Sequence, residues 1–203
     1  MMRIYANLAG LAVVAFLGWA AYMVWGRTPG DVYADCRQGV AGGDIGGAFT
    51  LVDQTGATVT DKEVLTKPAL VYFGYTFCPD VCPLDNARNA EAVDILQEQG
   101  FEVTPVFVTI DPSRDTVPVM AEYTANIHPG LLGLTGSAAQ IKAAAQAYKV
   151  FYQKQDSGDE FYLMDHSVFT YLMLPGSGFA DFYKRDVAAQ DMARSVGCFL
   201  QAS

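Results

Sequence analysis

A continuous apolar run that leads directly into two cysteines constrains the fold of this chain most strongly. Residues 69–75 are apolar and rich in β-prone side chains, as in a strand buried on both faces. Cys78 and Cys82 follow it at positions i and i+4. Because such positions share one face of a helix, the two sulfurs should converge on a first helical turn, where the helix dipole favours thiolates. The pattern therefore predicts a chemically active thiol pair at the end of a buried strand.

Helix and strand patterns alternate along the rest of the chain. A helix is expected over residues 84–99, ended by Gly100, and a second strand over residues 103–110. The other expected elements are a hairpin over 49–60, helices over 118–125 and 137–148, a hairpin with arms 150–153 and 160–164, strands over 168–174 and 179–183, and a closing helix over 187–200. This alternation predicts an α/β fold whose last two strands are antiparallel.

The N-terminal region is apolar for long enough to cross a bilayer. Residues 4–25 are almost entirely apolar, and at about 1.5 Å rise per residue they span roughly the 30 Å of a bilayer core. A cleaved signal peptide is the alternative, but its apolar region is shorter and ends at a small-residue cleavage site. Here apolar residues continue beyond Ala20 and Ala21. We therefore predict a retained N-terminal transmembrane helix.

The chain is predicted to have three parts. Residues 1–27 form the membrane anchor. Residues 28–47 are rich in glycine, aspartate and alanine and form a linker. Residues 48–203 form the folded domain, which is long enough for a full hydrophobic core.

The four cysteines indicate that this domain is exported. Disulfides persist in oxidising compartments, so we place the N-terminus in the cytoplasm and the main domain in the periplasm, as a single-pass protein of the inner membrane. Cys36 and Cys198 lie near the two ends of the domain, and the ends of a domain often lie close together. They are predicted either to form a structural disulfide or to remain two unpaired thiols.

The charge balance narrows the range of partners. The formal net charge is −9 in a chain that is 51% hydrophobic. Nucleic acid is excluded as a natural partner, because phosphate binding needs a basic surface. The acidic surface is compatible with cations or basic proteins as partners, and solubility alone also explains it.

The spacing of the cysteine pair allows two kinds of chemistry. A strand followed by a cysteine pair at a helix start is typical of thioredoxin-like redox motifs, which normally have two intervening residues. Cys78 and Cys82 have three, which favours a bridging metal without forbidding a disulfide. Thiolates are soft ligands that select Cu(I), zinc or iron-sulfur clusters.

A metal held by only two cysteines needs a third ligand from elsewhere in the chain. The two histidines, His128 and His166, are the candidates. Each is equally compatible with a hydrogen-bonded scaffold role, and His128 lies in a Pro-Gly context typical of a loop. Spacing alone leaves the choice between them open.

A polar turn, residues 111–116, follows the second predicted strand. Functional loops gather at the carboxyl ends of strands in open α/β sheets, so this turn should lie near the cysteines. Asp111 is expected either to shift the pKa of a thiol or to pair with Arg114. The alternative is that Asp111 and Asp115 only bond the turn backbone and cap the next helix.

Four motifs in a fixed order carry a family resemblance. They are FGYTFCPDVCP over residues 73–83, VTIDPSRDT over 108–116, GLTG over 133–136 and DHS over 165–167. With this ordered set the chain resembles the Sco/SenC family over most of the exported domain. The resemblance implies a thioredoxin-like fold with a membrane anchor, and a role in assembling the dinuclear copper centre of cytochrome c oxidase subunit II.

The resemblance also implies the ligands. Family members bind copper through two cysteines and one histidine, which correspond here to Cys78, Cys82 and His166, whereas His128 matches no ligand motif. Such a set serves Cu(I) through its thiolates and Cu(II) with the help of imidazole. Implied partners are subunit II and other copper chaperones. At the helix start after Pro83 the family is expected to have small hydroxyl residues, but residues 84–86 of this chain are Leu-Asp-Asn. We expect this difference to alter the partner surface.

Three functions compete. The first is a copper-delivering assembly factor, which passes copper to a partner's thiols by ligand exchange. The second is a thiol-disulfide oxidoreductase, in which Cys78 and Cys82 are a catalytic redox pair that reduces the cysteines of subunit II through a mixed disulfide. The third is a peroxidase or redox sensor, which would use a sulfenic acid and leave His166 without a role.

Overall fold

The computed structural model describes residues 13–22, 32–37, 44–155 and 161–202, in two units, 1–35 and 36–203. In the first unit residues 13–22 are helical and mostly exposed. The ends of the predicted membrane helix, residues 4–12 and 23–25, lie outside the described residues. Within the described ranges, no helix combines the length and the apolar character needed to cross a membrane.

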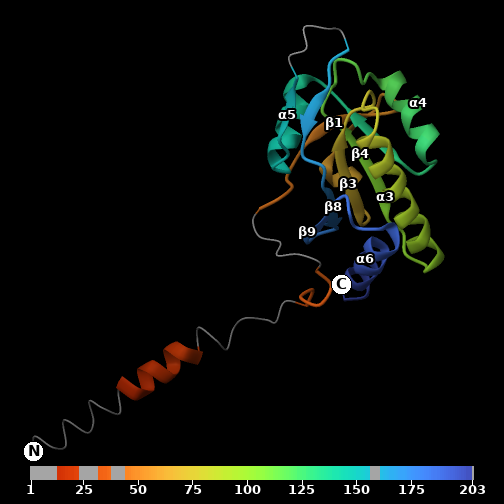
Figure 1. Cartoon of the computed structure of the whole chain (residues 1–203). Helices are drawn as coiled ribbons and strands as arrows, with labels where there is room; N and C mark the ends of the chain where they lie inside the picture. Colours follow the sequence, from red (N-terminus) through yellow and green to blue (C-terminus); the bar gives the residue numbers. More distant parts are fainter. Residues whose placement is uncertain (1–12, 23–31, 38–43, 156–160, 203) are drawn as a thin grey trace, which may run out of the picture. The chain divides into compact units, whose positions relative to one another are not determined.

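The second unit is built on a seven-stranded sheet with the order β2-β1-β5-β4-β3-β8-β9 (Figure 1). Its strands are β1 (Thr50–Asp53), β2 (Thr58–Thr60), β3 (Ala69–Gly74), β4 (Thr104–Thr109), β5 (Leu132–Thr135), β8 (Thr170–Leu174) and β9 (Gly178–Tyr183). β3 pairs in parallel with β4 and β4 with β5, and the other pairs are antiparallel. The predicted α/β fold and the antiparallel last pair are confirmed.

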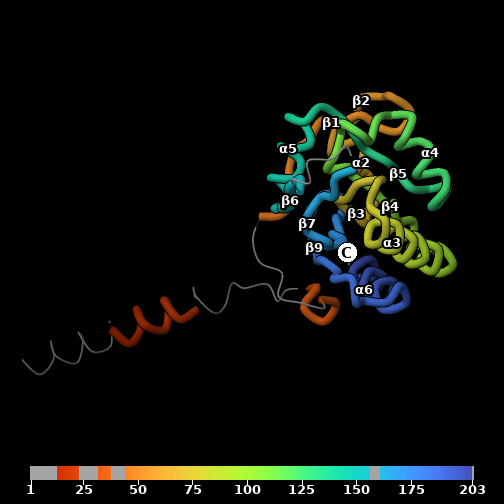
Figure 2. The backbone as a smooth tube through the Cα atoms, turned by 45° about the horizontal axis from the view of Figure 1, so that its top comes forward, coloured from red at the N-terminus to blue at the C-terminus, as the bar shows by residue number. Residues whose placement is uncertain are grey.

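Helices cover both faces of this sheet. They are α2 (Asp61–Val64), α3 (Val81–Glu98), α4 (Val117–Ile127), α5 (Ala138–Ala147) and α6 (Ala189–Ala202). In Figures 1 and 2, α5 lies on one side of the sheet and α3, α4 and α6 lie on the other. Every residue of β3 is buried, because a central strand between two helical layers has no solvent-facing side.

A second, two-stranded sheet consists of β6 (Tyr152–Lys154) and β7 (Met164–His166). The predicted hairpin arms, 150–153 and 160–164, were displaced toward the N-terminus. In the structure Tyr152 pairs with His166, so the histidine lies within a strand that continues beyond the predicted arm 160–164. These short strands are only partly buried, so no continuous hydrophobic face fixes their register in the sequence.

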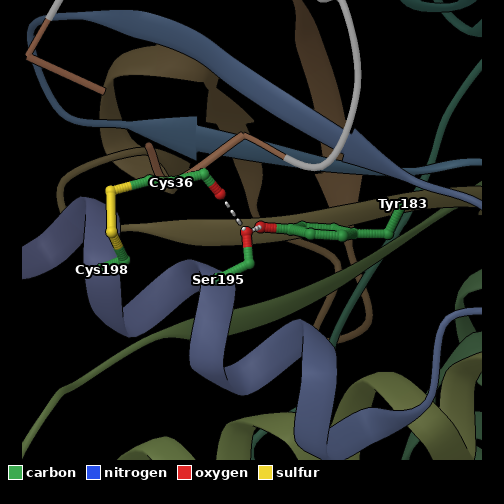
Figure 3. The surroundings of a disulfide bond; sticks show 4 residues. All are labelled: Cys36, Tyr183, Ser195 and Cys198. Atoms are coloured by element: carbon green, nitrogen blue, oxygen red, sulfur yellow. Dashed lines mark hydrogen bonds between the residues drawn. A yellow bond between two sulfur atoms is a disulfide. The ribbon is translucent and has the colours of Figure 1, made fainter. Parts of the chain in front are cut away.

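A disulfide joins Cys36 to Cys198 across 162 positions of sequence (Figure 3). Of the two alternatives left open for these cysteines, the structure contains the disulfide. Beside it the Ser195 hydroxyl donates a hydrogen bond to the Cys36 carbonyl at 2.9 Å and lies 3.0 Å from the Tyr183 hydroxyl. Since a carbonyl can only accept, the Ser195 proton is committed to Cys36, and Tyr183 donates to Ser195. The disulfide and this chain of bonds fasten the start of the domain to α6.

Candidate metal centre

The cysteine pair lies where β3 gives way to α3. α3 begins at Val81, so Cys82 is in its first turn whereas Cys78 lies in the preceding loop. The expectation that both cysteines occupy the first turn was therefore half right. The Cys82 backbone N–H donates to Cys78 Sγ at 3.3 Å, and the Cys78 N–H donates to the Tyr75 carbonyl at 3.3 Å. Both cysteines are buried free thiols.

Gly74 allows Cys82 to approach the end of β3. A Cβ atom at Gly74 would lie 2.8 Å from Cys82 Sγ and 3.0 Å from ring atoms of Phe107 and Tyr72. The Tyr72 hydroxyl, 3.9 Å from Cys82 Sγ, is its donor on the sheet side. Burial raises the pKa of Tyr72, so this hydroxyl stays protonated. The sequence motif contained this glycine, but only the structure explains why a side chain is excluded there.

His166 joins the pair from β7. Its Nε2 atom lies 3.4 Å from Cys82 Sγ, and its Nδ1 atom lies 2.8 Å from the Ser167 carbonyl. Because the carbonyl accepts only, Nδ1 carries the proton and the Nε2 lone pair faces the sulfur. The rings of Tyr72 and Tyr75 contact the imidazole edge-on and limit its rotation.

The two thiols differ in acidity. The hydrogen bond with Cys82 is the largest influence on the pKa of Cys78, and hydrogen bonds from the backbone N–H groups of Cys82 and Asp80 add to it. Together they lower the pKa of Cys78 to about 3, although burial acts in the opposite direction. The same hydrogen bond, together with burial, raises the pKa of Cys82. The cysteine pair thus carries one proton, which resides on the Cys82 sulfur.

The donor set suits a soft metal. Across the described ranges, no three cysteine, histidine, aspartate or glutamate side chains form a ready metal-binding cluster. Cys78 and His166 nevertheless both lie beside Cys82, since the Cys82 backbone N–H donates to Cys78 Sγ at 3.3 Å and His166 Nε2 lies 3.4 Å from Cys82 Sγ. Two thiolates and an imidazole are the ligand types that hold copper in either of its common oxidation states. The same two thiols, left without metal, can also form a disulfide.

His128 has a different environment. Its Nδ1 accepts a hydrogen bond from the Gly130 N–H at 3.0 Å, and its Nε2 lies 3.2 Å from Asp94 Oδ1. It also lines a depression with Val103 and Thr104, at the start of β4. The cysteines follow the end of β3, which runs parallel to β4. His128 therefore lies at the opposite end of the parallel strands from the cysteines. It is the loop residue that its Pro-Gly context indicated.

The polar turn after β4 reaches the cysteine loop, as expected. Asp111 forms an ion pair with Arg114, which confirms one of the two roles expected for it. Asp115 does more than bond its own turn, because its carboxylate accepts from the Thr76 N–H at 3.0 Å and from the hydroxyls of Thr76 and Thr109. It is fully buried, and burial raises its pKa. Asp115 thus fixes the loop that precedes Cys78 to the end of β4.

Residues 84–86 divide between surface and interior. Leu84 is exposed, whereas Asp85 and Asn86 are buried. Asp85 lies 3.9 Å from Arg88 and 3.6 Å from Arg185, and burial raises its pKa. Of the three, only Leu84 can change a partner surface, so that expectation was wrong for Asp85 and Asn86. A side chain in the first turns of α3 points inward or outward according to its position around the helix.

Comparison with known proteins identifies the family and the fold of this chain. A family model, SCO1/SenC, matches residues 38–201. Protein SenC of Rhodobacter capsulatus is 52% identical over 97% of this chain and 90% of its own length. The crystal structure of Arabidopsis thaliana ScoI with copper bound has a TM-score of 0.74 and 42% identity, over 77% of this chain and 99% of that one. Yeast Sco1 with copper bound gives a TM-score of 0.73 and 33% identity, over 79% and 91%.

The fold and the site define a thioredoxin-like protein with a widened cysteine pair and a histidine beside it. The chain belongs to the SCO1/SenC family.

Proposed function

We propose that this protein binds copper through Cys78, Cys82 and His166 and delivers it during assembly of cytochrome c oxidase. The observation that carries the proposal is the orientation of His166, whose Nε2 lone pair faces Cys82 Sγ at 3.4 Å while Nδ1 is bonded to the Ser167 carbonyl. An imidazole fixed in this tautomer is ready to act as a ligand. Solved structures of relatives from Arabidopsis and yeast contain copper.

The donor set supports both copper states. Cu(I) is held by the two thiolates, and Cu(II) gains the imidazole as a third ligand. Binding displaces the proton that Cys82 retains, because a thiol must be deprotonated to act as a ligand. Delivery is a ligand exchange in which thiolates of the partner replace Cys78 and Cys82 one at a time, without net electron transfer.

The receiving partner is cytochrome c oxidase subunit II, at its dinuclear copper centre, and other copper chaperones are the source. The family resemblance supports this assignment. Leu84 and Phe77 are both exposed and flank the cysteines in sequence, so they supply an apolar contact area for a protein partner.

The protein acts from the membrane. Residues 1–27 anchor it in the inner membrane as a single span, residues 28–47 link the anchor to the domain, and residues 48–203 form the copper-binding domain in the periplasm. The apolar character of residues 4–25 supports the anchor. The disulfide between Cys36 and Cys198 supports the oxidising compartment.

A second function is thiol-disulfide exchange, which the lowered pKa of Cys78 favours. The Cys78 thiolate attacks a disulfide of subunit II and forms a mixed disulfide, releasing one partner thiolate. Cys82, once deprotonated, attacks Cys78 and releases the second. The partner gains two electrons as two thiols, and Cys78 and Cys82 are oxidised to a disulfide.

Copper titration of the full chain, reduced and in detergent, tests the proposal. We expect one copper per chain and intense thiolate-to-copper absorption of the Cu(II) form, both lost in Cys78→Ala. His166→Ala should lose tight Cu(II) binding, whereas His128→Ala, the matched histidine control, should behave as the natural protein. Weak binding that is indifferent to His166 would contradict copper delivery and leave thiol-disulfide exchange as the function.

A further inference from the structure

The strand that carries His166 is not part of the main sheet. β6 and β7 pair only with each other within the described residues, and we call this pair the His166 sheet. The cysteines are held by β3 and α3, which belong to the main body of the domain. Residues 167–169 connect His166 to β8 of the main sheet, and contacts between the His166 sheet and the loop before Cys78 add to this connection.

Arg114 makes several of these contacts through Tyr162, two residues before β7. The guanidinium carbon lies 3.6 Å from the centre of the Tyr162 ring, and Nη1 donates to the Tyr162 carbonyl at 2.9 Å. The Tyr162 hydroxyl donates to Asp111 Oδ1 at 2.8 Å. Arg114 is paired with that same carboxylate through its Nε atom. Tyr162 is thus held by its ring, its backbone and its hydroxyl at once.

The same guanidinium group also contacts the cysteine loop. It lies 4.8 Å from the ring centre of Phe77, the residue before Cys78, and 5.7 Å from that of Tyr75. The Tyr75 hydroxyl accepts a hydrogen bond from the Met164 N–H at 3.3 Å. Arg114 therefore occupies the junction between the loop that leads to Cys78 and the segment that leads to His166.

The chemistry of this junction requires arginine. The side chain of Arg114 is only 15% exposed and that of Asp111 5%, so the ion pair is largely shielded from solvent. A guanidinium group is planar, so it can stack on aromatic rings while its edge donates to a carboxylate and a carbonyl. A lysine ammonium has no such plane and cannot make all these contacts together.

We propose that Arg114 is a positioning residue that holds His166 at the cysteine pair. It does so by binding Tyr162, together with Asp111, next to Phe77 in the loop before Cys78. This inference rests on the proposed function, because it concerns the histidine ligand of the same copper site. Among the described residues, Arg114 makes no hydrogen bond to Cys78, Cys82 or His166. Its effect on His166 is therefore transmitted through Tyr162.

The two copper states separate this role from general stabilisation. Cu(I) is held by Cys78 and Cys82, which lie in the main body of the domain, whereas Cu(II) also needs the imidazole. Loss of a residue that orients a metal ligand typically lowers metal affinity by about 10- to 100-fold. Arg114→Ala should lower Cu(II) affinity by that factor while Cu(I) affinity changes by less than about threefold.

A double-mutant cycle in the full chain, in detergent, tests the proposal. Cu(I) and Cu(II) affinities and Cu(II) spectra are measured for Arg114→Ala, His166→Ala and the double variant. If Arg114 acts through His166, its replacement has no further effect on Cu(II) affinity once His166 is absent. Arg114→Ala should also shift the Cu(II) absorption toward that of His166→Ala. Arg194→Ala, an exposed arginine of α6 paired with Asp191, is the matched control and should change neither.

Tyr162→Ala provides a second route, because it removes the clamped ring and leaves the pair between Asp111 and Arg114 intact. It should reproduce the Cu(II) loss, and it decides the matter if Arg114→Ala fails to fold. Equal losses of Cu(I) and Cu(II) affinity in either variant, or an undiminished effect without His166, would overturn the positioning role. If Arg114→Ala and Tyr162→Ala both bind Cu(II) normally while His166→Ala binds it weakly, this inference alone is overturned. Normal Cu(II) binding by His166→Ala overturns the proposed function and this inference with it.

Discussion

The Nε2 atom of His166 lies 3.4 Å from Cys82 Sγ, although 84 positions of sequence separate the two residues. One is on a two-stranded sheet and the other is on the first turn of α3. The contact brings an imidazole lone pair to a buried thiol at the end of the central strand. It follows that separate parts of the fold supply soft and borderline donor atoms to the site, a combination that suits either common oxidation state of copper.

The acidity of Cys78 predicts selective alkylation. Its pKa is lowered to about 3, so it is already a thiolate at pH 5, whereas the pKa of Cys82 is raised. Iodoacetamide should therefore modify Cys78 first, at a rate that stays nearly constant from about pH 5 to 8. Peptide mass spectrometry of the reduced, copper-free chain measures this. A rate that rises about tenfold per pH unit, as for an ordinary thiol with a pKa of about 8.5, would contradict it.

Gly74→Ala should damage the site directly. The added Cβ would lie 2.8 Å from Cys82 Sγ, and overpacking of this kind costs about 1–3 kcal/mol. We expect a lower free energy of unfolding together with weaker copper binding, measured by urea denaturation and copper titration. Gly133→Ala is the matched control, because its Cβ would meet Thr124 at 2.6 Å and should lower stability without weakening copper binding. Copper affinity unchanged in Gly74→Ala would argue against tight packing at Cys82.

Replacing both Cys36 and Cys198 with serine should affect stability alone. Their disulfide closes a long loop, and removal of a native disulfide typically costs about 2–5 kcal/mol. The urea midpoint of the double variant should fall accordingly, while its copper stoichiometry and Cu(II) spectrum stay unchanged. An unchanged midpoint would mean that the bond contributes little to folding.

Asp115→Ala should loosen the loop before Cys78. The change leaves the Thr76 N–H and two hydroxyl groups without their buried acceptor, and each unsatisfied group costs about 1–3 kcal/mol. Hydrogen exchange should become faster at Thr76 and its neighbours, and the free energy of unfolding should fall. Asp94→Ala, at an exposed aspartate, is the control. Equal exchange in both variants would contradict the anchoring role of Asp115.

Strong local patterns made the main body of the fold predictable. The apolar run over residues 69–75 identified β3, and the cysteines that follow it identified the start of α3 to within a few residues. Such signals need no knowledge of distant contacts. The pairing of Cys36 with Cys198 was also within reach, because the other two cysteines had a separate role and domain ends often meet.

Contacts between distant segments were beyond the sequence pattern. Spacing could not choose between His128 and His166, because the choice depends on which end of the parallel strands each histidine lies at. The short His166 sheet was expected with a shifted register, since its strands lack a continuous buried face. No local pattern signalled that Arg114 stacks on Tyr162, or that Asp115 accepts hydrogen bonds from Thr76.

Copper transfer to the receiving protein tests the central claim most directly. The Cu-loaded full chain, in detergent, is mixed with the reduced, copper-free copper-binding domain of cytochrome c oxidase subunit II, and the absorption spectrum of the dinuclear centre is followed. We predict that this spectrum appears with the natural chain and with His128→Ala, and fails to appear with His166→Ala. Transfer that is equally efficient without His166, or no transfer from a chain that still reduces the oxidised cysteines of subunit II, would contradict copper delivery through this site.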